Sequence, residues 1–378
     1  MITTHFLPHV SGITTHVLNV ASELVIRHGY EVDVLSPDFG GRFAESGKTP
    51  SGVGYGNFRS FAISKFFCLP TELPSQFILA DYYDLIHVHS YTSPMPLLIA
   101  LHSRFGPQDS RCKYVFTPHF HPISATFLTQ LMRLPYDAFF ERFIFESFDG
   151  VISPTEFEKA ALSPFTRSCK HSIIPHGVDL EEMQSVVVDS NVTSMLKSDE
   201  SSQLRAVFCG NLLKYKGVQH LLRAISILKN RGTSVQLNVI GDGPYHTHLV
   251  KLAQNLGIQS QVRFLGFLPR SLQLGVVKAS DVLVLPSEFE SFGIVLVEAM
   301  ALGKAVIASD FGGTTNLGIP KEFLVRYGDS HGLTSALNML VSGRVDRQLL
   351  GARYIQTVKE KYSWEQIGRS TADFYASL

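Results

Sequence analysis

Residues 286–308 hold the residue types and the spacing best suited to chemistry. This segment reads PSEFESFGIVLVEAMALGKAVIA, with Glu290 and Glu298 on either side of a Ser-Phe-Gly turn. The apolar run at 282–285 predicts a strand before the turn, and the pattern after it predicts a helix. The first N–H groups of a helix and its dipole attract phosphate, and Gly293 lets a ligand approach the backbone closely.

The two carboxylates can accept hydrogen bonds from hydroxyl groups on either side of a bound phosphate. A ligand with a diphosphate between two polyhydroxylated groups, as in a nucleotide sugar, would use all of these features. For Glu290 or Glu298 alone, the alternative is an ordinary amphipathic helix with a capping carboxylate, because acidic residues are common in the first helical turn. The segment as a whole therefore predicts a ligand-binding layout.

Length and composition restrict the class of protein. The 378 residues suit two domains, and a hydrophobic fraction of 45% with a mean hydropathy of +0.11 is ample for packed interiors. The 33 basic and 33 acidic residues leave no net field to attract nucleic acid. The four cysteines show no paired spacing, which indicates neither a disulfide framework nor a thiolate zinc site and fits a reducing cytosol. The sequence contains neither a membrane-spanning pattern nor a signal peptide pattern.

Short β-rich runs alternate with helical patterns, which is typical of βα units and a parallel sheet. Strands are predicted in the first half at 31–36, 84–89, 113–117, 150–153 and 171–174, with helices at 13–27 and roughly 125–147. After the polar stretch 189–203, strands are predicted at 205–209, 235–240, 262–265, 282–285 and 305–309. Two Rossmann-like halves follow from this series.

Because only residues 1–6 precede the loop at Pro8, we expect that the native protein begins upstream of Met1 or that the first strand is unusually short.

Two common nucleotide-binding motifs are incomplete or missing. Gly47-Lys48-Thr49 resembles the end of a P-loop, but Gly41 is one residue too far upstream and the following Pro-Ser-Gly does not continue as a helix. No Gly-x-Gly-x-x-Gly follows a predicted strand, so a dinucleotide cofactor is poorly supported.

Histidine pairs at 87–89 (His-Val-His) and 119–121 (His-Phe-His) lie near strand ends, where a metal site could form with His5 or His9. Because alternate residues of a strand face opposite ways, we expect each pair to be a poor chelate and predict no metal site.

No Asp-x-Asp occurs in the chain, which removes the commonest carboxylate pair for holding a divalent ion on a diphosphate. Positive charge for a diphosphate must then come from side chains and helix ends. Lys216, just before a predicted helix at 218–229, is the best-placed cation. The alternative for Lys216 alone is a solvated lysine beside a helix cap.

Further motifs extend along nearly the whole chain: Pro8-His9-Val10-Ser11-Gly12 before a helix with His16, Leu85-Ile86-His87-Val88-His89, Phe116-Thr117-Pro118-His119, Val151-Ile152-Ser153-Pro154-Thr155, Ile174-Pro175-His176-Gly177-Val178-Asp179, Gly210 to Gly217, and Val239-Ile240-Gly241-Asp242-Gly243. Together with Glu290-x7-Glu298 they resemble glycosyltransferase family 4. The resemblance implies an α/β architecture with the GT-B fold, in which two Rossmann-like domains with parallel sheets face each other across a cleft. We accordingly expect an acceptor-side domain at 1–185, a nucleotide-sugar-binding domain at 186–362 and a last helix, 363–378, that packs back on the first domain.

The resemblance also implies roles for individual residues. Glu298 is similar to the ribose-binding carboxylate, Glu290 to a contact of the transferred sugar, Lys216 to a diphosphate-binding lysine and His119 to a histidine that faces the sugar. His119, Glu290 and Lys216 are thus the expected catalytic residues. The other expected donor-binding residues are Gly12, Asn211, Asp242, Gly243, Ser291, Phe292, Gly293 and Ile294.

The reaction implied is transfer of a hexosyl group from a nucleoside-diphosphate sugar, with UDP or GDP as the expected nucleotide, to a lipid, glycan or small-molecule acceptor. The resemblance implies retention of the anomeric configuration and no metal or other cofactor. Charge stabilisation and alignment would then carry catalysis, with a covalent double displacement as the mechanistic alternative. The expected location is the cytoplasm, with peripheral contact to the cytoplasmic membrane face as an option.

Three positions depart from the family pattern. Asn211 stands where arginine is usual, so one of two expected diphosphate charges is missing, although Lys214 could substitute from a different register. Asn316 stands where an acidic residue is usual, and Ser11 replaces the first glycine of a pair. Asn211 therefore keeps open a catalytically weak nucleotide-sugar-binding or regulatory subunit. A sugar-nucleotide epimerase is a third alternative, against which the match around the paired glutamates argues.

Overall fold

The computed structural model describes residues 1–4, 6–7, 12–38, 46–62, 68–70, 82–91, 93–105, 111–119, 140–196, 203–310 and 312–378. Two compact units emerge: Met1–Gly177 together with Trp364–Leu378, and Val178–Ser363. The first unit thus ends at Gly177 and not at 185. Residues 178–185 belong to the second unit. The Val178 N–H donates to the Tyr362 carbonyl at 2.8 Å, and Glu182 of helix α5 (Leu180–Ser185) forms an ion pair with Arg270 of that unit.

The first unit is built on a mainly parallel sheet. Its strands are β1 (Asp33–Pro37), β2 (Gly47–Lys48), β3 (Gly54–Phe58), β6 (Leu85–His89), β7 (Lys113–Thr117), β8 (Gly150–Ser153) and β9 (Lys170–Ile173), in the orders β1-β3-β2 and β6-β7-β8-β9. Ile2 joins the two groups through parallel bridges to Leu35 and Val88, so the first strand is reduced to one bridge residue. β2, which holds the P-loop-like Gly47-Lys48, pairs antiparallel with β3. A separate antiparallel pair is formed by β4 (Ser60–Ala62) and β5 (Cys68–Pro70).

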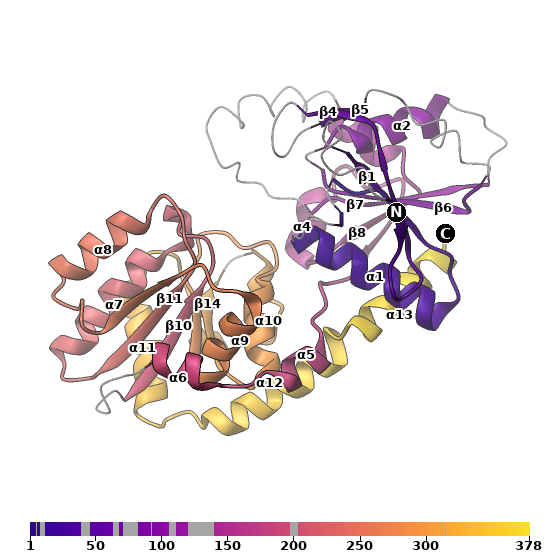
Figure 1. The fold of residues 1–378 in the computed structure, drawn as a ribbon. Coiled ribbons are helices and arrows are strands. Elements are labelled where there is room, and N and C mark those ends of the chain that lie inside the picture. The colour runs from indigo at the N-terminus through magenta and orange to yellow at the C-terminus, as the bar shows by residue number, and fades with distance from the viewer. Residues whose placement is uncertain are drawn as a thin grey trace. The chain divides into compact units, whose positions relative to one another are not determined.

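The helices beside this sheet whose bounds lie within the described residues are α1 (Gly12–His28), α2 (Met95–Phe105), α4 (Glu156–Leu162) and α13 (Trp364–Ala376). α1 buries Val17, Ala21 and Leu24 on one face, as an amphipathic helix does. α13, from the far end of the chain, lies against α1 so closely that a Cβ on Gly368 would stand 2.5 Å from Glu23 Cβ (Figure 1). Of the helix predicted at roughly 125–147, residues 140–146 are helical and 125–139 lie outside the described residues.

The second unit is a doubly wound parallel sheet. Its strands are β10 (Leu204–Cys209), β11 (Val235–Ile240), β12 (Val262–Gly266), β13 (Val282–Leu285), β14 (Ala305–Ser309) and β15 (Leu324–Val325), in the order β12-β11-β10-β13-β14-β15. β11, β13 and β14 are buried at every position, as expected for strands covered on both faces. The five strands predicted in this half are all present.

Helices cover both faces of this sheet (Figure 1). They are α6 (Ser190–Met195), α7 (Val218–Asn230), α8 (His246–Asn255), α9 (Arg270–Ala279), α10 (Ile294–Ala301), α11 (Ser330–Val341) and α12 (Arg347–Lys361). α7 packs against α8 and α11, whereas α10 packs against α9 and α12. The most apolar of them, α10, is only 8 residues long. Among the described residues, no helix combines the length and the apolar character needed to cross a membrane.

Candidate functional site

The strand order of the second unit contains a topological switch point. From β10 the chain winds through β11 and β12 to one side of the sheet, and β13, β14 and β15 lie on the other side. Ligands of open parallel sheets bind outside the carboxyl ends of the strands at such a point. The loops that follow β10 and β13 carry most of the donor-binding residues predicted from the sequence, so the fold places them at the edge where a ligand is expected.

Glycines bring the loops after β10 and β11 into backbone contact. A Cβ on Gly241 would stand 2.0 Å from the carbonyl oxygen of Gly210, and one on Gly243 would stand 2.5 Å from that of Leu212. The Leu212 N–H donates to the Asp242 carbonyl at 2.9 Å, which ties the two loops together. The Asp242 carboxylate accepts the Gly243 N–H at 2.7 Å, so this side chain is held within its own turn.

The loops after β10 and β13 meet in the same way. Lys216 ends the short 3-10 turn η2 (Lys214–Lys216), and its Nζ donates to Glu290 Oε2 at 2.8 Å. The two side chains are 16% and 17% exposed, so the ion pair is only partly screened by water. Behind it, the Glu288 N–H donates to the Tyr215 carbonyl at 2.7 Å. The structure thus joins two predicted catalytic residues across the switch point.

The close contact between these loops requires a glycine at position 217. The Gly217 φ of +76° is left-handed, and a Cβ would stand 1.9 Å from the carbonyl oxygen of Pro286. Gly343 is a matched control because its φ is +69° and a Cβ there meets no atom within 4 Å. We expect Gly343→Ala to cost about 1 kcal/mol for the backbone conformation alone, and Gly217→Ala to lower the unfolding free energy by clearly more. Urea unfolding followed by circular dichroism measures both, and equal losses would contradict the close approach.

The N-terminus of α10 is open. Its N-cap, Gly293, has a φ of +76°, and no side chain caps the helix. The preceding turn is supported from below, since the Gly313 N–H donates to the Glu290 carbonyl at 2.9 Å and Phe292 packs edge-on against Tyr362. An uncapped helix start presents N–H groups and partial positive charge, which suits a phosphate group.

Glu298 lies one turn further along α10 and is paired with a residue that the sequence analysis did not select. Arg270, the first residue of α9, donates from Nη1 to Glu298 Oε1 at 2.7 Å and from Nε and Nη2 to the Glu182 carboxylate at 2.8 and 2.7 Å. The Glu298 side chain is 5% exposed. Burial raises the pKa of Glu298 above its ordinary value, and Arg270 opposes that shift.

A signal for Arg270 was present in the sequence. A cation in the first turn of a helix is disfavoured by the helix dipole, so Arg270 directly after Pro269 indicates acidic partners elsewhere in the chain. Burial lowers the pKa of the Arg270 guanidinium, but its bonds with Glu182 and Glu298 raise that pKa overall.

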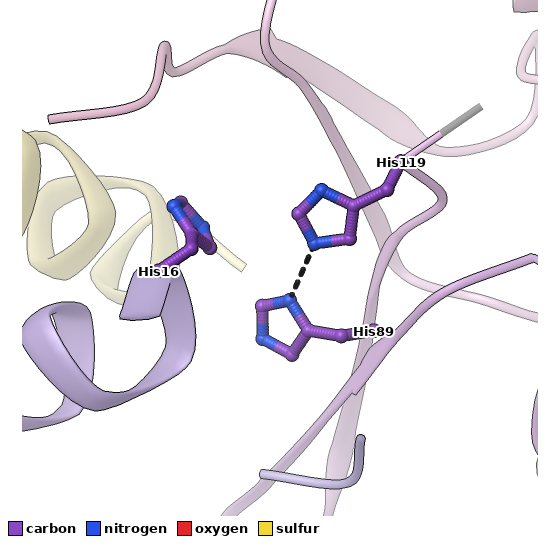
Figure 2. A group of neighbouring side chains, drawn as sticks. All are labelled: His16, His89 and His119. Carbon is purple, nitrogen blue, oxygen red and sulfur yellow. Dashed lines mark hydrogen bonds between the residues drawn. The ribbon is translucent and has the colours of Figure 1, made fainter. Parts of the chain in front are cut away.

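The first unit gathers histidines at the carboxyl ends of its strands (Figure 2). His16 comes from α1, His89 ends β6 and His119 follows β7, and one ring nitrogen of each lies within 4.8 Å of the others. His89 Nδ1 and His119 Nε2 are 3.3 Å apart. His16 Nδ1 lies 3.0 Å from His176 Nδ1. Burial lowers the pKa of His16 and His89 well below the ordinary value and that of His119 to about 3, so these imidazoles are neutral at pH 7.

The expectation that a His-x-His pair diverges is wrong for 87–89. The ring centroids of His87 and His89 are 4.1 Å apart. Residues two apart on a strand lie on the same face, and only adjacent residues face opposite ways. His87 is committed to neighbours, with Nε2 at 2.7 Å from Thr117 Oγ1 and Nδ1 bonded to the Tyr375 hydroxyl at 2.5 Å. His5, His9 and His121, the other histidines considered for a metal site, lie outside the described residues.

Two family models match the chain in succession. "Glycosyltransferase Family 4" matches residues 10–182, and "Glycosyl transferases group 1" matches residues 197–356. The chain belongs to the group 1 glycosyltransferases. It is 25% identical to the uncharacterized glycosyltransferase MJ1607 of Methanocaldococcus jannaschii, over 99% of this chain and 97% of that protein.

Solved structures support the fold of this glycosyltransferase. Sucrose-phosphate synthase from Thermosynechococcus elongatus superimposes with a TM-score of 0.76 at 21% identity, over 100% of this chain and 98% of that one. Anabaena HepE in complex with UDP-glucose superimposes with a TM-score of 0.74 at 18% identity, over 100% and 99% of the two chains. The chain therefore has the GT-B fold, with two Rossmann-like domains, and the predicted fold class is confirmed.

The predicted site residues of this glycosyltransferase belong to both units, and some of those in the second unit are in contact. In the second unit, Lys216 and Glu290 are paired, and residues 291–294 form the uncapped start of α10. Asn211 is exposed in the loop after β10. Gly12 begins α1 in the first unit, where a Cβ would meet no described atom within 4 Å, and His119 belongs to the histidine group. The sequence analysis missed Arg270, and it did not place His16 with the other histidines.

Proposed function

We propose that this glycosyltransferase moves a hexosyl group from a UDP- or GDP-linked sugar to a lipid, glycan or small-molecule acceptor, with retained anomeric configuration and without a metal ion. The observation that carries the proposal is the Lys216–Glu290 ion pair at the switch point, where the uncapped start of α10 also lies. Phosphate, sugar and ribose each have a chemically matched partner within this one unit.

The donor's parts correspond to named groups. Lys216 and the N–H groups at the start of α10 suit the diphosphate, because both offer positive charge. Glu290 suits a hydroxyl of the transferred sugar, and Glu298, held in place by Arg270, suits the ribose hydroxyls. The UDP-glucose carried by the HepE structure, which shares this fold, supports a nucleotide sugar as donor.

The proposed chemistry relies on charge and alignment. As the sugar–phosphate bond breaks, negative charge grows on the diphosphate oxygens, and in this proposal Lys216, which is paired with Glu290 at 2.8 Å, stabilises that charge. An acceptor hydroxyl attacks from the face that the diphosphate leaves, which retains the configuration. Positive charge from Lys216 and the helix start takes the part that a divalent ion plays in other transferases. His119 is proposed as a further contact of the transferred sugar.

Nucleotide binding tests the donor assignment. UDP, GDP and ADP and their sugar conjugates are each added to the protein, and the melting temperature is recorded beside Glu298→Ala. A ligand at a hundred times its Kd adds about 2.7 kcal/mol, so one nucleotide series should raise the melting temperature by several degrees and lose this effect in the variant. If no series stabilises the protein, the donor site as described here is wrong.

A catalytically weak, nucleotide-sugar-binding subunit is the second candidate. It is favoured by Asn211, an exposed neutral residue where the family usually supplies a second positive charge. Turnover separates the two candidates: the subunit would bind the nucleotide series without releasing nucleoside diphosphate from the sugar conjugate. An epimerase would convert the donor in the absence of any acceptor.

A further inference from the structure

The histidine group of the first unit has features that sugar transfer does not require. His16, His89 and His119 come from one helix and two neighbouring strands, and each offers a ring nitrogen to the same space (Figure 2). His16 and His89 are buried and His119 is half-buried. Among the described residues, the group of possible metal ligands consists of these three histidines and contains no carboxylate or cysteine.

The spacing of the nitrogens fits a transition-metal ion. Two nitrogens bound to Zn²⁺ at about 2.1 Å in a tetrahedral arrangement are about 3.4 Å apart. His89 Nδ1 and His119 Nε2 are 3.3 Å apart, and His16 completes the set within 4.8 Å. Three imidazoles with an open fourth position match the ligand set of some Zn²⁺ sites.

Outer contacts and unused nitrogens point the same way. His16 Nδ1 lies 3.0 Å from His176 Nδ1, which orients the His16 ring and leaves Nε2 for a ligand. His89 Nε2 is buried and has no hydrogen-bond partner among the described residues. It can carry the proton of the neutral ring, which leaves the lone pair of Nδ1 for the ion. Burial keeps all three rings neutral at pH 7, so each ring has one nitrogen without a proton. His89 Nδ1 and His119 Nε2 share a hydrogen bond in the structure, and its proton moves to the other nitrogen of the same ring when an ion takes that place.

We propose that His16, His89 and His119 together bind one divalent transition-metal ion of the Zn²⁺ class. Imidazole ligands favour Zn²⁺, Cu²⁺ and Ni²⁺ over Mg²⁺ and Ca²⁺. The ion ties α1 to the ends of β6 and β7 within the first unit. It is not a cofactor of sugar transfer. Because it occupies His119, it competes with the transferred sugar, and this consequence alone rests on the proposed function.

The chain provides its own reporter for the ion. Trp364 is the single tryptophan of the sequence, and its ring centroid lies 5.8 Å from that of His16. Bound Co²⁺ or Cu²⁺ quenches a tryptophan at this range, whereas Zn²⁺ is detected by displacing Co²⁺. The experiment uses tag-free protein, treated with EDTA and dialysed, and titrates it with Co²⁺ alone while Trp364 fluorescence and visible absorption are recorded.

Matched variants assign the ligands. We expect one Co²⁺ per chain, affinity at least about a hundredfold weaker in His16→Gln and in His89→Gln, and no change in His331→Gln, an exposed histidine of α11 in the second unit. Circular dichroism and the emission of Trp364, which lies in the first unit, show that each variant is folded. Glu298→Ala should lose the nucleotide and keep the ion, so the two proposals can fail separately. Absence of a saturable Co²⁺ signal in the wild type, or equal affinities in all variants, would overturn the metal site.

Discussion

Replacing Lys216 by alanine is expected to lower kcat/KM for sugar transfer by about 10²- to 10³-fold, the loss typical when one group that stabilises transition-state charge is removed. The reason is local, because Lys216 is the cation paired with Glu290 at the switch point and Asn211 supplies no second charge. The variant also leaves the Glu290 carboxylate without its cation, which disfavours a developing negative charge nearby.

Lys214→Ala is the matched control for this prediction. Lys214 belongs to the same 3-10 turn but is exposed, and it is the residue that could replace the missing arginine from another register. A nearly unchanged rate in Lys214→Ala would assign the charge to Lys216 alone. A comparable loss in both variants would show that Lys214 supplies the second charge, and an unimpaired Lys216→Ala enzyme would remove the proposed role.

The second large effect concerns the stability of the second unit. Arg270→Met is expected to cost about 3–5 kcal/mol of unfolding free energy, because it leaves the buried Glu298 carboxylate without its partner. Glu298→Gln should cost about 1 kcal/mol or less, because the half-exposed Arg270 keeps Glu182 as its partner. The two ends of one ion pair are therefore expected to differ severalfold.

The pH dependence checks the cause. In Arg270→Met the pKa of Glu298, already raised by burial, rises further above its ordinary value of 4.5. A group whose folded pKa exceeds its unfolded pKa binds more protons in the folded state, so stability falls as pH rises. The deficit of Arg270→Met should therefore grow from about pH 4.5 upward. Circular dichroism follows the helices and strands of both units, whereas Trp364 fluorescence reports the first unit alone, so an early transition seen only by circular dichroism belongs to the second unit. Equal losses in the two variants, or a pH-independent deficit, would contradict a buried charge.

Sequence reasoning reached the parallel sheets and the local motifs because both are encoded over short stretches. The buried strands of the second unit read as apolar runs, and the turn before α10 is visible as Ser-Phe-Gly between two glutamates. The contacts that it missed form between residues that are far apart in the sequence. Arg270 contacts Glu298, 28 residues away in the sequence, and Glu182, 88 residues away. Its place at a helix start indicates acidic partners, but no local pattern identifies which carboxylates they are.

The histidines show a different kind of miss. His16 on a helix and His89 on a strand come together only when α1 packs beside the carboxyl ends of the sheet. The two-residue period of a strand puts His87 and His89 on the same face, so their proximity could have been predicted from the sequence. The prediction was wrong because it placed these residues on opposite faces. A short first strand, by contrast, was one of the two alternatives expected from the sequence. In the structure, Ile2 forms the bridges to Leu35 and Val88.

The most direct test of the account is release of nucleoside diphosphate from a panel of UDP-, GDP- and ADP-sugars, with mixed lipid, glycan and small-molecule acceptors, with and without EDTA. We predict that one donor series is turned over, that EDTA does not lower the rate, and that the turnover is lost in Lys216→Ala and kept in Lys214→Ala. A folded protein that is stabilised by a nucleotide series yet releases no diphosphate from any donor would contradict catalysis and favour the binding subunit.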